Sequence, residues 1–323
     1  MHYPTDVSLL WDAMRKAMII CGRESADRGW DEWRQYQHNV RGLKRQSRRI
    51  SKLKRSGAKD EVKREAKNQQ IQQAHRDYIE AAERYLERAR QTRAKLEKAA
   101  KVNLIVAVEL KELDRFMDHA ERQIGQIRRR VLEGKSIPHE EKVFSVFEEY
   151  TEWISKGKAG VPVELGLKVA IVEDQYRFIL NHRVLQKTED VEAAVPLIAE
   201  TQKQYGTLHS ASLDMGFHSG ENQTQLAKIV KLVVLPKKGK SSVADAMRES
   251  DPEFIRLRKQ HAAVESAINA LECHGLDRCL DHGIRGFKRY VALAVLARNV
   301  LRLGQIIHRD EAHRKRRADQ KAA

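Results

Sequence analysis

The chain opens with a long stretch in which apolar residues recur every three or four positions. Between about residues 7 and 130 charged residues are dense and proline is absent. The spacing is clearest at Ile71, Ala74, Tyr78, Ala81, Ala82, Tyr85, Leu86 and Ala89. This interval places apolar side chains on one face of an α-helix. We therefore expect three or more long helices in a hairpin or bundle, with turns near Gly57 and near residues 102–108.

After Gly134 the pattern changes to short runs rich in β-branched and aromatic residues, bounded by Gly, Pro, Asp or Lys. Such runs predict strands at 143–147, 161–172, 176–185, 208–213 and 232–235. Helical spacing appears at 190–205 and 222–229, and later at 255–273 and 287–307. The order of elements predicts an α+β fold in which helices flank a mixed sheet. We divide the chain into a helical region (1–135), a core (136–310) and a basic tail (311–323).

Composition indicates a folded protein with a polyanionic partner. The 323 residues are 41% hydrophobic, which is enough for a buried core. The formal charge of +16 favours DNA, because each neutralised phosphate releases condensed counterions, and an anionic membrane surface is the second choice. We find no apolar run of about 18 residues and no signal peptide, so we expect a cytoplasmic protein with no membrane partner. Three cysteines in such a chain favour reduced thiols over disulfides.

A basic run at residues 44–55 belongs to the helical region. Its lysines and arginines have few acidic neighbours in sequence, so it is a candidate for contact with a DNA backbone. A charge run on a long helix is also often a solvated face. The sequence leaves both interpretations open.

Asp214 follows the apolar run that ends at Leu213 and precedes a glycine-bearing turn. A carboxylate at the carboxyl end of a sheet strand faces the crevice in which open sheets bind ligands. Asp is also common as a helix cap and in turns. Glu265 borders an apolar stripe of Val264, Ile268 and Leu271, although a glutamate on a helix is by default solvated.

Carboxylates that converge on one crevice suit hard divalent cations, because Mg²⁺ prefers oxygen ligands. Two such ions activate a water or a 3′-hydroxyl and stabilise the leaving oxygen. Asp214 and Glu265 are therefore candidate catalytic and metal-binding residues, for Mg²⁺ or Mn²⁺, in cleavage or transfer of a phosphodiester.

Short basic loops provide candidate DNA-binding residues, since lysine and arginine beside glycine contact phosphates without reading bases. These residues are Lys156, Lys158, Lys237, Lys238, Lys240, Arg285, Lys288 and Arg289. Cys273, His274, Cys279 and His282 have the side chains of a zinc site, but their spacing is irregular. Packing between a helix and a loop accounts for them better.

Several segments together resemble DDE-type insertion-sequence transposases, specifically the not-classified-yet insertion-sequence family. They are HYPTD at 2–6, FSVFEEYTEWI at 144–154, KGKA at 156–159, ELG at 164–166, DMGFHS at 214–219, LPKKG at 235–239, AVESAIN at 263–269, HGLDR at 274–278, GFKRY at 286–290 and ARN at 297–299. The resemblance implies an RNase H-like core, DNA cleavage and strand transfer at element ends, and a homo-oligomer that takes no small-molecule substrate. It makes Asp214 the second and Glu265 the third of three metal-binding acids.

The resemblance also puts the first acid on a strand just before the HYPTD segment, which here follows Met1 directly. Asp6 lies on the other side of that segment and is expected to cap the helix that starts at Val7. We therefore expect a truncated form of reduced or no activity, whose helical region is an insertion between core strands. The alternatives are an inactive DNA-binding or oligomerising remnant and a helical structural protein, and the β-rich second half argues against the last.

Overall fold

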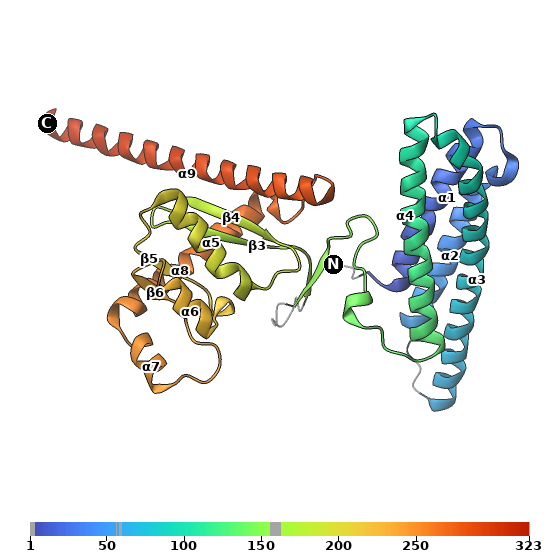
Figure 1. Ribbon diagram of the computed structural model, residues 1–323, viewed down its shortest axis with the longest axis horizontal. Coiled ribbons are helices and arrows are strands. Elements are labelled where there is room, and N and C mark those ends of the chain that lie inside the picture. The colour runs from blue at the N-terminus through green and yellow to red at the C-terminus, as the bar shows by residue number, and fades with distance from the viewer. Residues whose placement is uncertain (1–3, 56, 58–59, 156–162, 323) are drawn as a thin grey trace. The chain divides into compact units, whose positions relative to one another are not determined.

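The structure is a computed structural model that describes residues 4–55, 57, 60–155 and 163–322. The chain forms two compact units, Met1–Glu149 (unit 1) and Tyr150–Ala323 (unit 2), each drawn in Figure 1. The division falls after residue 149, whereas the sequence pattern changes near residue 135. Residues 143–147, expected as a strand, are irregular and complete unit 1. There Val146 is fully buried, and the Phe147 ring lies 6.0 Å from that of Phe116.

Four long helices make up most of the described part of unit 1 (Figure 1). They are α1 (Asp6–Asp27), α2 (Tyr36–Arg55), α3 (Glu61–Ala100) and α4 (Leu104–Ile127). A short turn of helix at Asp31–Trp33 lies between α1 and α2, and two more, at Arg128–Leu132 and His139–Glu141, follow α4. Helix α1 packs against the other three. Its buried Leu10, Met14 and Met18 share one core with Tyr78 of α3 and Phe116 of α4. The unit is therefore the bundle that the helical periodicity predicts.

The helix starts correct two details of the sequence analysis. Thr5 caps α1, since its Oγ1 accepts from the Ser8 N–H at 3.2 Å, so Asp6 is the first helical residue rather than the cap. The Asp6 carboxylate instead pairs with Arg130 at 2.6 Å. Asn103 caps α4, so the second turn ends there and residues 104–108, expected within the turn, form the start of the helix.

Unit 2 contains three two-stranded sheets in its described part. The strands are β1 (Glu152–Ser155), β2 (Val163–Gly166), β3 (Lys168–Glu173), β4 (Ile179–Leu185), β5 (Ser210–Ser212) and β6 (Leu232–Val234). The pairs β1–β2 and β3–β4 are antiparallel, and β5–β6 is parallel. An α+β fold is thus present. The single mixed sheet expected from the sequence is not formed by the described residues, and β1 was not expected.

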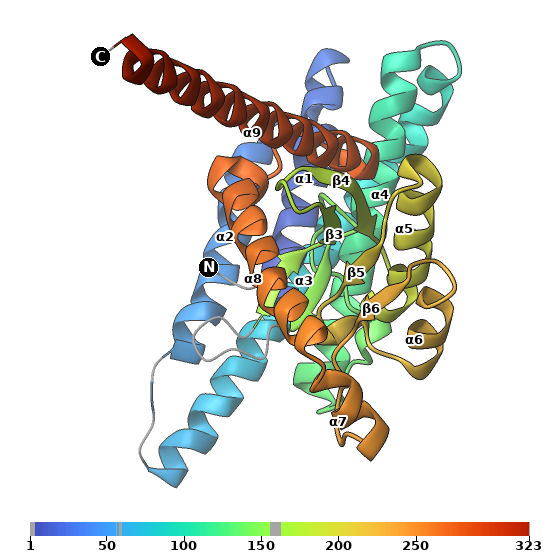
Figure 2. The same cartoon turned by 90° about the vertical axis from the view of Figure 1, so that its left-hand side faces the viewer.

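Helix α5 (Asp190–Tyr205) covers two of these sheets. Ala194 and Ile198 pack into the cluster that holds residues of β5 and β6, while Ala193 and Leu197 pack against Ala170 and Leu185 of the β3–β4 hairpin. Val172 of β3 contributes to both clusters. The two sheets therefore share one covering helix, although β3 and β5 are not hydrogen-bonded to each other (Figure 2).

The remaining helices of unit 2 are α6 (Gly220–Leu226), α7 (Val243–Glu249), α8 (Pro252–Leu271) and α9 (Gly283–Ala322). Helix α7 was not expected, and α9 continues through the segment that the sequence suggested only as a basic tail. By length and composition alone, Gly283–Gln320 would be able to cross a membrane, a test that core helices of soluble proteins also pass. A cytoplasmic location stays a prediction.

Candidate functional site

Asp214 lies two residues after β5, at the carboxyl end of the parallel pair β5–β6. The Leu213 N–H donates to the Val234 carbonyl at 3.0 Å and so extends the pairing up to Asp214. The Asp214 side chain is exposed, and its Oδ1 accepts from the Met215 N–H at 2.7 Å. The carboxylate therefore caps the short helical turn Met215–Phe217, which is the capping role that the sequence also allowed for Asp214. It remains open to solvent.

Parallel strands bring lysines to the same edge as Asp214. Because β5 and β6 run in one direction, the residues after β6 emerge beside those after β5. That segment carries Lys237, Lys238 and Lys240, of which the last two are exposed. The Lys237 N–H donates to Glu249 Oε1 at 2.7 Å, which ties the segment to α7. Asp214 and this lysine-bearing segment therefore leave the sheet at the same edge, where the Glu249 carboxylate also lies.

Asn222 holds the turn that follows Asp214, and sequence reasoning did not single it out. Its side chain is buried and donates to the carbonyls of Val191 at 2.7 Å and Phe217 at 2.8 Å. Ser219 caps helix α6 (Gly220–Leu226), which contains Asn222, because its Oγ accepts from the Asn222 N–H at 3.0 Å. The sequence gives little sign of this role for Asn222, because the Val191 carbonyl that it binds lies 31 positions away along the chain. Asn222 is a positioning residue for this edge.

Glu265 lies on α8, which packs against β5 and β6 (Figure 2). The helix is anchored by Ala267 and Leu271, whereas Ile268, expected in the buried stripe, is 41% exposed. Glu265 is exposed as well. The structure thus brings the helix of Glu265 to the strand that precedes Asp214. Among the residues described, no group of three or more His, Cys, Asp or Glu side chains is arranged to hold a metal.

The other predicted basic residues divide between α9 and a segment outside the described residues. Arg285, Lys288 and Arg289 lie in the first turns of α9 and are exposed. Arg289 pairs with Asp281, and this guanidinium, helped by the His282 N–H, lowers the pKa of the Asp281 carboxyl. Lys156 and Lys158 lie outside the described residues.

The cysteines and histidines near α8 have other contacts. Cys273 is exposed, with its Sγ 3.8 Å from Asn269 Oδ1, and Cys279 Sγ lies 3.4 Å from the Asp281 carbonyl oxygen. Both are local contacts, within four residues along the chain, so the packing of a helix against a loop stays a prediction for these residues.

The basic run of residues 44–55 lies on α2 in unit 1. Leu43 and Ile50 of α2 are buried in the bundle. On the opposite face of this helix, four exposed cations recur at intervals of three and four residues. This basic stripe consists of Arg45, Arg48, Lys52 and Arg55. Other cations of the run are engaged, since Lys44 lies over the Trp11 ring and Arg49 is 3.6 Å from Asp77. No described acid forms an ion pair with the stripe.

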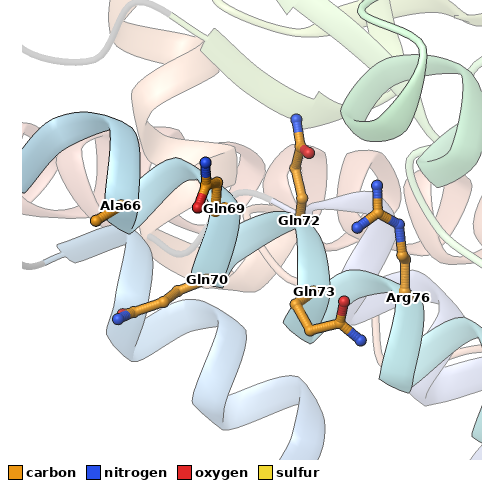
Figure 3. Close-up of a pocket in the computed structure, with 6 residues that line it drawn as sticks. All are labelled: Ala66, Gln69, Gln70, Gln72, Gln73 and Arg76. Carbon is orange, nitrogen blue, oxygen red and sulfur yellow. The ribbon is translucent and has the colours of Figure 1, made fainter. Parts of the chain in front are cut away.

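A shallow, open depression lies on α3, and Figure 3 shows its lining of Ala66, Gln69, Gln70, Gln72, Gln73 and Arg76. Its volume is about 530 Å³. It is built from one face of one helix and lies in a different unit from Asp214 and Glu265, so it does not bear on the chemistry of these acids.

Comparison of the chain with family models, with curated proteins and with solved structures found no match.

Proposed function

We propose that the chain acts as a DDE-type insertion-sequence transposase, cleaving DNA and transferring strands at element ends with Mg²⁺ or Mn²⁺. The observation that carries the proposal is the carboxyl edge of β5–β6, where Asp214 emerges beside Lys237, Lys238 and Lys240. A carboxylate at such an edge suits a metal, and lysines beside it suit the phosphates of the substrate.

The order of elements in unit 2 supports an RNase H-like core. An antiparallel hairpin, β3–β4, is followed by α5, β5, α6 and β6, and then by α8. One extended strand between β3 and β5 would join the two sheets under α5 into a single sheet, because each of these strands pairs on one edge only within the described chain. The resemblance places the first acid on a strand of this kind, ahead of the HYPTD segment.

The exposure of the two acids supports a metal. Asp214 and Glu265 are exposed, and neither forms an ion pair with a described residue, although the chain carries a charge of +16. Carboxylate oxygens fit Mg²⁺ and Mn²⁺, and these two residues supply two of the three ligands that the resemblance implies. A bound metal would supply Lewis-acid activation of a water or hydroxyl. Lys237, Lys238 and Lys240 hold the phosphate backbone at the same edge.

The test is DNA nicking by a chain to which an amino-terminal strand carrying an aspartate has been added, as the resemblance implies for the first acid. We expect metal-dependent nicking at the element's terminal repeats and its loss in Asp214→Asn and in Glu265→Gln. Glu272→Gln is the matched control, because Glu272 is also exposed and lies seven residues beyond Glu265. Nicking that survives in Asp214→Asn would refute the assignment of this acid.

A second candidate is a DNA-binding protein without nuclease activity. It is favoured by the basic stripe of α2 and by the lack of a three-acid group among the described residues. It predicts binding to duplex DNA that falls with salt and is unaffected by EDTA. Replacing the four stripe residues with Gln should reduce the slope of log K against log salt by roughly 3 to 4. Metal-dependent nicking by the 323-residue chain itself would exclude this candidate.

A further inference from the structure

Helix α9 has two apolar faces, and one of them is occupied within unit 2. Val295 packs with Ile179 of β4 and with Leu271 of α8. The Asn299 side chain binds both backbone groups of Ile179, accepting from its N–H and donating to its carbonyl at 2.9 Å each. Arg302 Nε donates to the Tyr176 carbonyl at 2.9 Å. This face therefore fixes α9 along the β3–β4 hairpin, in the arrangement drawn in Figure 1.

The opposite face exposes five large apolar side chains. They are Leu293 (57% exposed), Leu296 (58%), Val300 (60%), Leu303 (50%) and Ile307 (48%). Their intervals of three, four, three and four residues are those of the a and d positions of a heptad. Turning 100° per residue places this set, the α9 seam, away from the buried Val291 and Val295. The seam covers about 22 Å of helix at 1.5 Å per residue.

We propose that the α9 seam pairs with the same seam of a second copy of this chain, in antiparallel orientation. Arg289 lies four residues before Leu293, and Glu311 lies four residues after Ile307, both on the line of the seam. Within the chain Arg289 pairs with Asp281 and Glu311 lies 3.7 Å from His308, but each of the two side chains is 66% exposed and so can also meet a second copy. An antiparallel pair centred on Val300 places Arg289 of each copy opposite Glu311 of the other. A parallel pair would place arginine against arginine and glutamate against glutamate, which is unfavourable.

A second copy accounts for the seam better than a lipid bilayer does, although α9 is long and apolar enough to span one. The helix face opposite the seam carries Arg298, Asn299 and Arg302, and a bilayer would expose these polar groups to lipid. Insertion would also break the three hydrogen bonds of Asn299 and Arg302 to the β4 region. Pairing of helices buries the seam and leaves that face unchanged.

The first experiment measures the mass of the full chain by sedimentation equilibrium across a range of concentrations. We expect a dimer, twice 37.2 kDa, with a dissociation constant in the micromolar range, because the helix is already folded but the seam is short. Leu296→Glu and Val300→Glu should each weaken the dimer at least about tenfold. Val243→Glu on α7, at an apolar side chain that is 80% exposed, is the matched control and should leave it unchanged.

The second experiment tests orientation by disulfide cross-linking in a chain with Cys273→Ser and Cys279→Ser. Antiparallel pairing predicts that a mixture of Leu293→Cys and Ile307→Cys chains forms a cross-linked dimer and that neither does so alone. Glu311→Arg should weaken the dimer, and adding Arg289→Glu should restore it. Circular dichroism checks that the variants keep their helix content; all the replaced positions are exposed except the half-buried Cys279.

Three results would overturn the pairing of the seam with a second copy. The first is a monomer at 100 micromolar, roughly the upper end of the expected range. The second is a dimer that is insensitive to both Leu296→Glu and Val300→Glu. The third is a chain that stays monomeric in solution but floats with phosphatidylglycerol vesicles in a manner abolished by Val300→Glu, which would assign the seam to a membrane. Self-cross-linking of Leu293→Cys alone would overturn the antiparallel orientation. The proposal does not depend on nuclease activity, so failure of the nicking test leaves it intact.

Discussion

Replacing Glu24 with glutamine should stabilise the helical bundle at alkaline pH. Glu24 of α1 is 4% exposed, and its Oε2 lies 2.8 Å from Arg28 Nη1. Burial raises the pKa of its carboxyl from 4.5 to about 7, and the hydrogen bond shared with the Glu109 carboxyl of α4 adds to the rise. Arg28 offsets only part of this effect. The native bundle therefore favours the protonated acid.

The size of the effect follows from linkage between protonation and folding. Below pH 4.5 the acid is protonated in both states, so native and unfolded chains are affected equally. As pH rises from there to about 7, the unfolded chain ionises first and stability is lost. At pH 8 the accumulated loss is about 3 kcal/mol, since each pKa unit corresponds to about 1.4 kcal/mol. At pH 5 it is below about 1 kcal/mol.

Urea unfolding of Glu24→Gln and of the parent chain at pH 5 and pH 8 measures this difference. Tryptophan fluorescence in a Trp153→Phe background reports on unit 1, which holds the other three of the four tryptophans. The control is Glu80→Gln, because Glu80 is 71% exposed and pairs with Arg84 on the surface. Its effect should stay below about 1 kcal/mol at either pH. The linkage would be refuted if the free energy of unfolding of Glu24→Gln, relative to that of the parent chain, did not rise between pH 5 and pH 8.

Three further substitutions test individual contacts. Asn222→Ala removes two hydrogen bonds to backbone carbonyls and should lower the free energy of unfolding of unit 2 by about 1–3 kcal/mol, measured by urea titration. Trp33→Phe removes the 2.7 Å bond from its indole N–H to Thr92 Oγ1 and should destabilise unit 1 by roughly 1–2 kcal/mol. Asn299→Ala leaves both backbone groups of Ile179 without this partner, so amide hydrogen exchange in β4 and α9 should accelerate while α1 to α4 stay protected.

Periodicity predicted the helices because each long helix must bury one stripe against its neighbours. The prediction of strands failed at residues 143–147, a short run of β-branched and aromatic residues interrupted only by Ser145. Ser145 Oγ accepts from the N–H groups of Phe147 and Glu148, at 3.2 Å and 3.0 Å, and this turn replaces a strand ladder. Val146 and Phe147 cover the bundle instead. An apolar pair that closes the end of a bundle and an apolar pair in a strand have the same sequence signature.

The separate sheets have a comparable explanation. The sequence predicts a strand wherever a short apolar run lies between turns, but strands join into one sheet only where backbones are adjacent. β3 and β5 are covered by the same helix and yet belong to different sheets. Register and adjacency depend on pairing between distant segments, which the local pattern does not contain.

The position of Asp214 was predictable because a carboxylate directly after an apolar strand comes to lie at the sheet edge. Its two interpretations, helix cap and metal ligand, turn out to be compatible. The Met215 N–H holds Oδ1 and so orients the carboxylate, while the side chain is still exposed to solvent. Asp214→Asn keeps an oxygen acceptor for the cap but loses the charge, whereas Asp214→Ala loses both. We therefore expect Asp214→Asn to abolish Mn²⁺ binding, measured by water-proton relaxation, at unchanged melting temperature, and Asp214→Ala to lower both. If Asp214→Asn bound Mn²⁺ as the parent chain does, the cap would be the whole role of this residue.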